Sequence, residues 1–313
     1  MTDLLAFGAA ALELTPPGRE RLETADRLTV AATGPAANAA VAAARLGTDA
    51  AWLSTLPDTA LGRRVTSEIA SHGVETAIQW TDEGRQALAF AERAGPPRGN
   101  ARIEDRTASA ITSATPEEFP LSAVGEPGTV FVDAALATRS ATLVDTTATL
   151  LDKTGDTGTE TVLGLGRREP SAATIEAAEE VLPAVDTLIA AETGAAALGG
   201  RANPTETAHA LAAEHDLETV VIAREEGGVV WDDRTVHERA SPATETVDDR
   251  GAFDALCGGF LARRAAGVEA GAALAAGVAS EALARTVPGP APAITSDEVE
   301  RCVASMAASG TIE

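Results

Sequence analysis

One short stretch of this 313-residue sequence, VDDRGAFDALCGGFLARR at 247–264, combines residue types that can transfer charged groups. Its apolar spacing predicts a helix that begins just after Gly251. A helix N-terminus exposes unpaired backbone N–H groups and carries roughly half a positive charge, so it favours an anion. Asp254 lies in the first turn, where a carboxylate could accept a hydroxyl proton while these N–H groups stabilise a transferred phosphoryl group. Alternatively, Asp254 only caps the helix or complements its dipole.

The histidines and cysteines show no spacing that indicates a metal site or a redox motif. The four histidines lack the spacing of a metal site, and Cys257 and Cys302 form neither a Cys-x-x-Cys nor a zinc pattern. We therefore expect no metal bound by protein side chains and no disulfide framework, as is typical of a reducing cytoplasm. The N-terminus lacks the pattern of a signal peptide, and no segment reaches about 18 uninterrupted apolar residues. A cytoplasmic protein without a membrane span is the expectation.

The elements that must position these residues alternate along the chain. Short apolar segments predict buried strands at 4–7, 52–53, 129–133, 161–166, 187–191 and 219–223, and segments of helical composition lie at 37–46, within 62–76, at 171–182 and at 205–216. This alternation favours a single α/β domain, 1–313, with a mostly parallel sheet covered on both faces. Two segments break the rhythm, at about 13–33 and 78–107, and a turn at 82–84 predicts a hairpin in the second. We expect both segments to form a small β lid.

The net charge of the chain excludes some classes of binding partner. Aspartates and glutamates number 47 against 24 lysines and arginines, a formal net charge of −23, and Lys153 is the only lysine. Such a field repels nucleic acid and anionic membranes, so neither is an expected partner. The composition also favours a halophilic origin, because molar salt reduces the Debye length to roughly 3 Å and screens self-repulsion. The alternative is an ordinary acidic, arginine-rich protein.

Two segments resemble the signatures of a known family. The residues DDRGAFD at 248–254, followed by Ala-x-x-x-Gly-Phe-Leu, resemble the D-T-x-G-A-G-D signature of the ribokinase-like (PfkB-type) carbohydrate kinases. The segment TGPAANAAVAAARLG at 33–47 resembles the other signature of that family, and 58–74 and 284–295 resemble further segments in the same order. The resemblance implies a ribokinase-like three-layer sandwich with a mostly parallel central sheet and a small β lid. PPRG followed by Asp105-Arg106 is most similar to the ketodeoxygluconate kinase branch.

This resemblance implies an ATP-dependent kinase that phosphorylates a hydroxyl of a sugar or sugar acid, with Mg²⁺ accompanying ATP. Asp254 would deprotonate the hydroxyl, and the N–H groups of the anion hole (Gly251, Ala252 and Phe253) would stabilise the γ-phosphate. Arginines would bind the carboxylate of a sugar acid, because a guanidinium matches a planar carboxylate with two hydrogen bonds. The implied substrate-binding residues are Gly34, Asn38, Arg106, Arg168 and Glu13, and the implied nucleotide-binding residues are Arg224, Gly228 and Glu192. The resemblance also implies a homodimer formed through the lid.

The sequence departs from the family pattern at several site positions, and four of them bear most directly on activity. Phe253 stands where the family has glycine, and Glu225 stands at the glycine of the nucleotide-side turn. Ala9 and Gly166 replace a glutamate and an asparagine of the sugar-acid branch. A side chain at 253 adds a ring where a phosphate should approach. Three interpretations stay open: a sugar-acid kinase, a catalytically impaired relative that binds a small molecule or partner in the old cleft, or a kinase for a nucleoside or other ring substrate.

Overall fold

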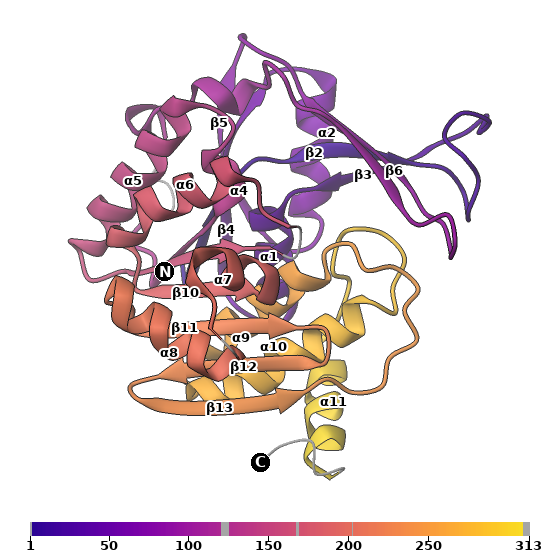
Figure 1. Cartoon of the computed structure of the whole chain (residues 1–313). Coiled ribbons are helices and arrows are strands. Elements are labelled where there is room, and N and C mark those ends of the chain that lie inside the picture. The colour runs from indigo at the N-terminus through magenta and orange to yellow at the C-terminus, as the bar shows by residue number, and fades with distance from the viewer. Residues whose placement is uncertain (1, 120–124, 167–168, 202, 309–313) are drawn as a thin grey trace.

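The computed structural model describes residues 2–119, 125–166, 169–201 and 203–308. Its centre is a nine-stranded sheet in the order β13-β12-β11-β10-β9-β8-β1-β4-β5 (Figure 1). The strands from β11 across to β5 run parallel, and β12 and β13 complete one edge in antiparallel pairs. These strands are β1 (Leu4–Phe7), β4 (Ala50–Pro57), β5 (Glu75–Thr81), β8 (Thr129–Asp133), β9 (Glu160–Leu165), β10 (Thr187–Ala191), β11 (Thr219–Arg224), β12 (Gly227–Asp232) and β13 (Thr235–Ala240).

Helices cover both faces of this sheet, which gives three layers. One face packs against α1 (Pro35–Arg45), α2 (Ala60–Ala70), α9 (Ala252–Ala265), α10 (Ala270–Ala284) and α11 (Ser296–Ala308). The other face packs against α5 (Ala141–Gly155), α6 (Ala172–Val181), α7 (Glu192–Gly199) and α8 (Pro204–His215), with the short α4 (Ala134–Ala137) beside them. No helix in the described ranges combines the length and the apolar character that a membrane span requires.

The alternation of side chains along β1 shows how the sequence builds two cores. Leu4 and Ala6 belong to the core on the α9 side, whereas Leu5 and Phe7 belong to the core on the α5 side. Successive side chains of a strand point to opposite faces, so an uninterrupted apolar strand requires cover on both. The expected α/β sandwich with a mostly parallel sheet is therefore confirmed, and the solved structures compared below share it.

The second sheet is the lid, and its strands project from the main body in Figure 1. Its order is β3-β2-β6-β7, with β2 parallel to β6 and the outer pairs antiparallel. These strands are β2 (Ala11–Thr15), β3 (Thr29–Thr33), β6 (Ala87–Glu92) and β7 (Ala101–Asp105). The expected lid segment at 78–107 began too early. Residues 78–81 belong to β5 in the central sheet, where they pair with residues 54–57 of β4, and the turn at 82–84 connects the two sheets.

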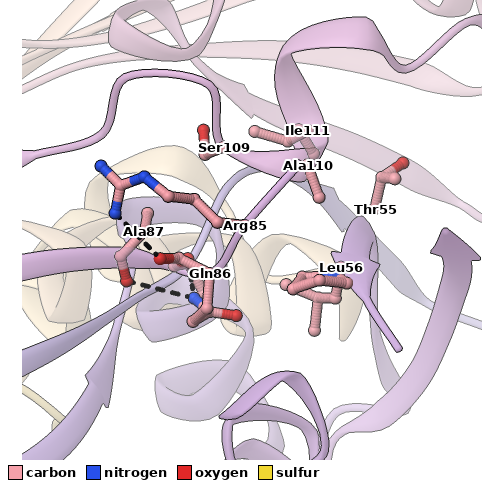
Figure 2. Close-up of a pocket in the computed structure, with 10 residues that line it drawn as sticks. Thr55, Leu56, Arg85, Gln86, Ala87, Ser109, Ala110 and Ile111 are labelled. Atoms are coloured by element: carbon pink, nitrogen blue, oxygen red, sulfur yellow. Dashed lines mark hydrogen bonds between the residues drawn. The ribbon is translucent and has the colours of Figure 1, made fainter. Parts of the chain in front are cut away.

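The junction between the lid and the main body is tied by one buried amide. Gln86 precedes β6, and its side-chain Nε2 donates a hydrogen bond of 2.9 Å to the carbonyl of Ala10, just before β2 (Figure 2). The pocket beside it, which Ser109 and Thr55 also line, encloses about 10 Å³. That is roughly the volume that one water molecule requires. The two chain segments that lead into the lid are thus joined where they leave the central sheet.

Candidate active site

A pocket of about 760 Å³ lies between the inner face of the lid and the carboxyl ends of the central strands. Asp133 at the end of β8 and Gly166 just after β9 line it from the sheet. Arg102 and Arg106 line it from the lid, and Asp254 lines it from the first turn of α9. Open α/β sheets bind their ligands at the carboxyl ends of parallel strands, so this position is typical of a substrate site.

Gly251 makes the sharp turn into α9. Its φ of 71° lies in the left-handed region, and an added Cβ would overlap the carbonyl oxygen of Pro290. The amide of Ala252 donates to the carbonyl of Asp249 at 3.3 Å. The amides of Phe253 and Asp254 are first-turn groups without a partner inside the helix, and no acceptor for them lies among the described residues. The turn therefore presents N–H groups to an anion in the pocket.

Asp254 is held beside these amides by Asn38 of α1. The Nδ2 of Asn38 donates to Oδ2 of Asp254 at 2.8 Å and also contacts Oγ1 of Thr33 at 3.3 Å. Burial, helped by the charge of Asp133, raises the pKa of Asp254 to about 7 against the opposing effects of the Asn38 hydrogen bond and of Arg102. A carboxylate with a pKa near the operating pH can both accept and release a proton, which is what a general base requires.

Phe253 and Gly166, two of the departures from the family pattern, are neighbours in space. A Cβ built at Gly166 would lie 3.7 Å from Cδ1 and 3.9 Å from Cε1 of Phe253, which is ordinary van der Waals contact, so the ring packs directly beside Gly166. The ring is 7% exposed and belongs to the core on the α9 side, although the residue also lines the pocket. Phe253 lies within a regular helix and does not need a positive φ. The ring of Phe253 is therefore mostly packed in the core beside Gly166, and its backbone keeps ordinary helical geometry.

Glu13 does not line the pocket and instead holds two arginines. Its side chain is fully buried and forms ion pairs with Arg102 of β7 and with Arg250 of the loop before α9. Arg250 also donates its Nε to Asp248 at 2.8 Å and its Nη1 to Thr15 at 3.0 Å. Burial alone would raise the pKa of Asp248, but hydrogen bonds from Arg250 and from the amide of Gly289 lower it. This network ties the lid to the loop that carries Gly251.

Of the remaining predicted substrate-binding residues, Gly34 and Arg106 lie at the pocket. Gly34 caps α1 at the pocket, where an added Cβ would overlap the carbonyl oxygen of Ala9. Arg106 lines the pocket and pairs with Glu104, with 2.8 Å between Nε and Oε2 and 3.1 Å between Nη2 and Oε1. Burial lowers the pKa of Arg106, and the charge of Glu104 opposes this. Arg168 lies outside the described residues.

Two pocket residues were missed by the sequence reasoning. Asp133 ends the buried strand TVFVD, and its Oδ1 accepts a hydrogen bond from the amide of Ala135 at 3.0 Å. Burial raises the pKa of Asp133 to about 6. A carboxylate that closes an otherwise apolar strand was a visible signal, because strand ends form the site in this fold. Arg139, just after α4, also lines the pocket, and no local pattern pointed to it.

The predicted nucleotide-binding residues lie outside this pocket. Arg224 ends β11 and forms an ion pair with Glu238, and Glu192 is the exposed first residue of α7. Gly228 is buried in β12, where an added Cβ would lie 3.0 Å from Cδ1 of Leu274 in α10. The ends of β10 and β11 that carry Glu192 and Arg224 lie beside β9 along the same edge of the sheet, so a long ligand could reach them from the pocket.

The residues present fit a nucleotide triphosphate better than a metal held by the protein alone. Across the described ranges, no group of three or more histidine, cysteine, aspartate or glutamate residues could hold a metal ion. The turn at Gly251 offers backbone donors beside an acid in a pocket large enough for a small substrate. A divalent ion would therefore have to enter with the phosphates that it neutralises.

Comparisons with known proteins agree with this geometry. The profile of the "pfkB family carbohydrate kinase" matches residues 1–297. A 2-dehydro-3-deoxygalactonokinase of Haloferax volcanii is 42% identical over 307 residues, covering 96% of each protein. The crystal structure of 2-dehydro-3-deoxygluconokinase from Thermotoga maritima is 23% identical with a TM-score of 0.89, covering 97% of this chain and all of that one. A putative ribokinase II from E. coli in complex with ATP and Mg²⁺ is 18% identical with a TM-score of 0.88, with the same coverage.

Proposed function

The chain belongs to the pfkB family of carbohydrate kinases, and from this premise we propose that it phosphorylates a hydroxyl of a 2-dehydro-3-deoxy sugar acid with ATP. The premise makes it a sugar kinase, a phosphotransferase with an alcohol acceptor. The 42% identical relative, whose name gives a sugar-acid substrate, supports the proposed substrate class, as does the concentration of arginines around the pocket. The ATP-bound relative supports ATP as the phosphoryl donor.

Each group at the α9 turn has a role in this reaction. Asp254 accepts the proton of the substrate hydroxyl as the oxygen attacks, and Asn38 keeps the carboxylate oriented. The amides of Phe253 and Asp254, with the positive end of the helix, stabilise the negative charge of the transferred group. Mg²⁺ that accompanied the triphosphate would neutralise part of the phosphate charge. The tight packing of Gly251 against Pro290 fixes these donors before the substrate arrives.

The observation that carries the proposal is the contact between Asn38 and Asp254. It holds the acid at the pocket beside the helix N-terminus, with a pKa of about 7. A residue that only capped the helix would not need a buried amide from α1, 216 positions away in the sequence. The burial of the Phe253 ring in the core on the α9 side also argues against an obstructed anion site.

The nucleotide is proposed to extend from the α9 turn along the ends of β10 and β11. Glu192 and Arg224 lie at those strand ends, where Glu192 could reach Mg²⁺ through water and Arg224 could contact the nucleotide. Gly228 supports this region indirectly, because it lets β12 pack closely against α10. The exposed Glu225 follows Arg224 and faces solvent, which leaves the turn free of a buried carboxylate.

A substrate panel tests the proposal. The purified protein is incubated with ATP and Mg²⁺ and with a 2-dehydro-3-deoxy sugar acid, a neutral hexose or a nucleoside, and ADP release and the phosphorylated product are measured. We expect turnover on the sugar acid with a kcat/KM at least tenfold above the other two. Turnover on the nucleoside alone would favour the ring-substrate alternative. Calorimetric binding of ATP or of the acid without any turnover would favour the impaired-relative alternative.

A homodimer through the lid is also proposed. The strand registers place Val30, Leu14, Phe90 and Ile103 in one row across the face of the lid opposite Glu13, and the Ile103 side chain is 58% exposed. An apolar row on a projecting sheet is typical of a protein–protein interface. Light scattering should give the mass of a dimer for the native chain and of a monomer for Phe90→Asp. A native monomer would refute this proposal.

We also propose that the protein is cytoplasmic and adapted to high salt. Cys257 and Cys302 are free thiols, as in proteins of a reducing compartment. The net charge of −23 and the single lysine fit a protein that folds best in concentrated salt.

A further inference from the structure

Most arginines around the pocket already have a carboxylate partner. Arg102 and Arg250 share Glu13, Arg250 also pairs with Asp248, and the Nη1 of Arg93 lies 3.4 Å from Oδ2 of Asp248. Arg106 forms an ion pair with Glu104, and its Nη2 donates a hydrogen bond of 3.1 Å to the same carboxylate. Their charges are therefore neutralised before any substrate arrives, and they stabilise the lid and the loop at Gly251.

Arg139 is different from these residues. It follows α4 and lines the pocket, but its guanidinium makes no ion pair or hydrogen bond with any residue in the described ranges. Its Nε is buried without an acceptor. Arg139 as a whole is only half-buried, but a charged group that has lost part of its hydration without gaining a partner is less stable than a hydrated or paired one. Such a group is stabilised when an anion enters the pocket.

The surroundings of Arg139 keep it charged and available. Burial lowers its pKa to about 10, and repulsion from Arg106 adds to this, whereas attraction to Asp133 opposes it. It is therefore still a cation at neutral pH. Asp133 is near enough to attract it but forms no ion pair with it, and one oxygen of Asp133 is occupied by the amide of Ala135.

We propose that Arg139 binds the carboxylate of the substrate and so makes the enzyme select sugar acids over neutral sugars. The inference rests on the proposed function, which supplies a substrate with both a carboxylate and a hydroxyl. It follows from the position of Arg139 on the pocket wall formed by β8 and α4, while Asp254 lines the wall formed by α9. A substrate that spans the pocket can then have its acid group on Arg139 and its reacting hydroxyl on Asp254.

Arg106 has a supporting role in this arrangement. Its two contacts with Glu104 would have to be exchanged for contacts with the substrate, whereas Arg139 gives up no protein partner among the described residues. The positive charge of Arg106 still favours an anion nearby. Binding of a carboxylate would also relieve the repulsion between the two guanidinium groups.

The test uses Arg139→Gln, Arg139→Lys and a control, Arg201→Gln. Arg201 precedes α8, and its side chain is 48% exposed and pairs at 3.6 Å with Glu214. Steady-state kinetics are measured with the sugar acid, with the corresponding neutral sugar in which the carboxylate is reduced to an alcohol, and with ATP. Binding of the acid is measured separately by calorimetry, and melting temperature reports folding.

We expect Arg139→Gln to raise the KM and the Kd for the acid by at least about tenfold, the range for a lost hydrogen bond to a charged group. The KM values for the neutral sugar and for ATP should change by less than about twofold by the same reasoning. The KM and Kd of Arg139→Lys for the acid should lie between those of the native protein and of Arg139→Gln. Lysine keeps the positive charge but cannot form the two parallel hydrogen bonds of a guanidinium. The melting temperature of Arg139→Gln should not fall, since the guanidinium has no hydrogen bond or ion pair with a described residue to lose.

An unchanged KM for the acid, or an equal rise for the acid and the neutral sugar, would overturn the assignment while leaving the kinase reaction intact. A native protein that neither binds nor phosphorylates the acid would refute the proposed function itself, and the role of Arg139 with it. A loss of acid affinity in Arg201→Gln would also count against a specific role for Arg139.

Discussion

Replacing Asn38 by alanine should move the pH at which the enzyme becomes active to a higher value. The Nδ2 of Asn38 donates to Asp254 at 2.8 Å, and this hydrogen bond favours the ionised carboxylate. In the native protein the pKa of Asp254 is about 7, so activity should increase as the pH rises through neutrality and the base loses its proton. Without the hydrogen bond, burial and the charge of Asp133 act unopposed by Asn38, and the proton should be held more tightly.

The size of the shift follows from the strength of the lost bond. A hydrogen bond to a charged group contributes about 1.5–3 kcal/mol, and about 1.4 kcal/mol corresponds to one pKa unit. The pKa of Asp254 should therefore rise by about 1–2 units. At pH 7 the ionised fraction would fall from about a half to roughly 1–10%, and the rate should recover at alkaline pH.

The assay is the pH dependence of kcat/KM at fixed salt for the native enzyme, Asn38→Ala and a matched control, Thr33→Val. The control removes only the other acceptor of Asn38, at 3.3 Å, so its pH profile should match that of the native enzyme. If Asn38→Ala keeps the native midpoint, or if its lost activity does not return at high pH, the hydrogen bond does not set the ionisation of the base.

Three further predictions concern the packing around the site and the charge of the chain. Phe253→Ala should lower the free energy of unfolding by about 3–5 kcal/mol in denaturant titrations and should not raise activity, because the ring is packed in the core on the α9 side. Faster turnover would mean that the ring obstructs the phosphate. Glu13→Gln should lower the free energy of unfolding by about 3–5 kcal/mol, because it leaves Arg102 and Arg250 without their shared carboxylate. A decrease below about 1 kcal/mol would mean that these ion pairs behave as if they were exposed to solvent. The melting temperature should rise between 0.1 and 2 M KCl as the Debye length falls from about 10 Å to below about 3 Å; a melting temperature that is independent of salt would contradict the halophilic interpretation.

The central layers of the fold could be predicted because local pattern and burial agree. The segment TVFVD at 129–133 and the segment at 187–191 are strands with the expected bounds. Each is a short apolar run that must be covered on both faces, so its sequence permits little else. Helices with caps were also predictable, as for α8, where Asn203 accepts from the amide of Glu206.

The lid boundaries were harder to predict because its strands are short and rich in small or polar residues. The local sequence at 78–81 suggests that the lid begins there. In the structure these residues continue β5 and pair with β4, which the local sequence does not reveal. The hairpin turn lies between β6 and β7 instead, at 93–100. Strand pairing is a property of distant residues, so the sequence alone could not place this boundary.

The parts of the site in which a local motif fixes the backbone geometry could be predicted. The parts in which a side chain depends on partners far away in the sequence could not. Gly251 and Asp254 followed from a glycine before a helix, and the structure brings them to one pocket. The pairing of Glu13 with Arg102 and Arg250 could not be seen, because the three residues are far apart in the sequence. For the same reason the sequence alone could not show that the ring of Phe253 packs in the core beside Gly166.

The central claim is that Asp254 acts as the base in phosphoryl transfer to a sugar acid, and Asp254→Asn tests it most directly. Asparagine keeps the size of the side chain and its place beside Asn38 but cannot accept the proton. We predict that turnover of ATP and the 2-dehydro-3-deoxy sugar acid falls by about 10²–10⁴-fold, while calorimetric affinity for ATP stays within a few-fold of the native value. Retention of more than a tenth of the native rate would contradict the account.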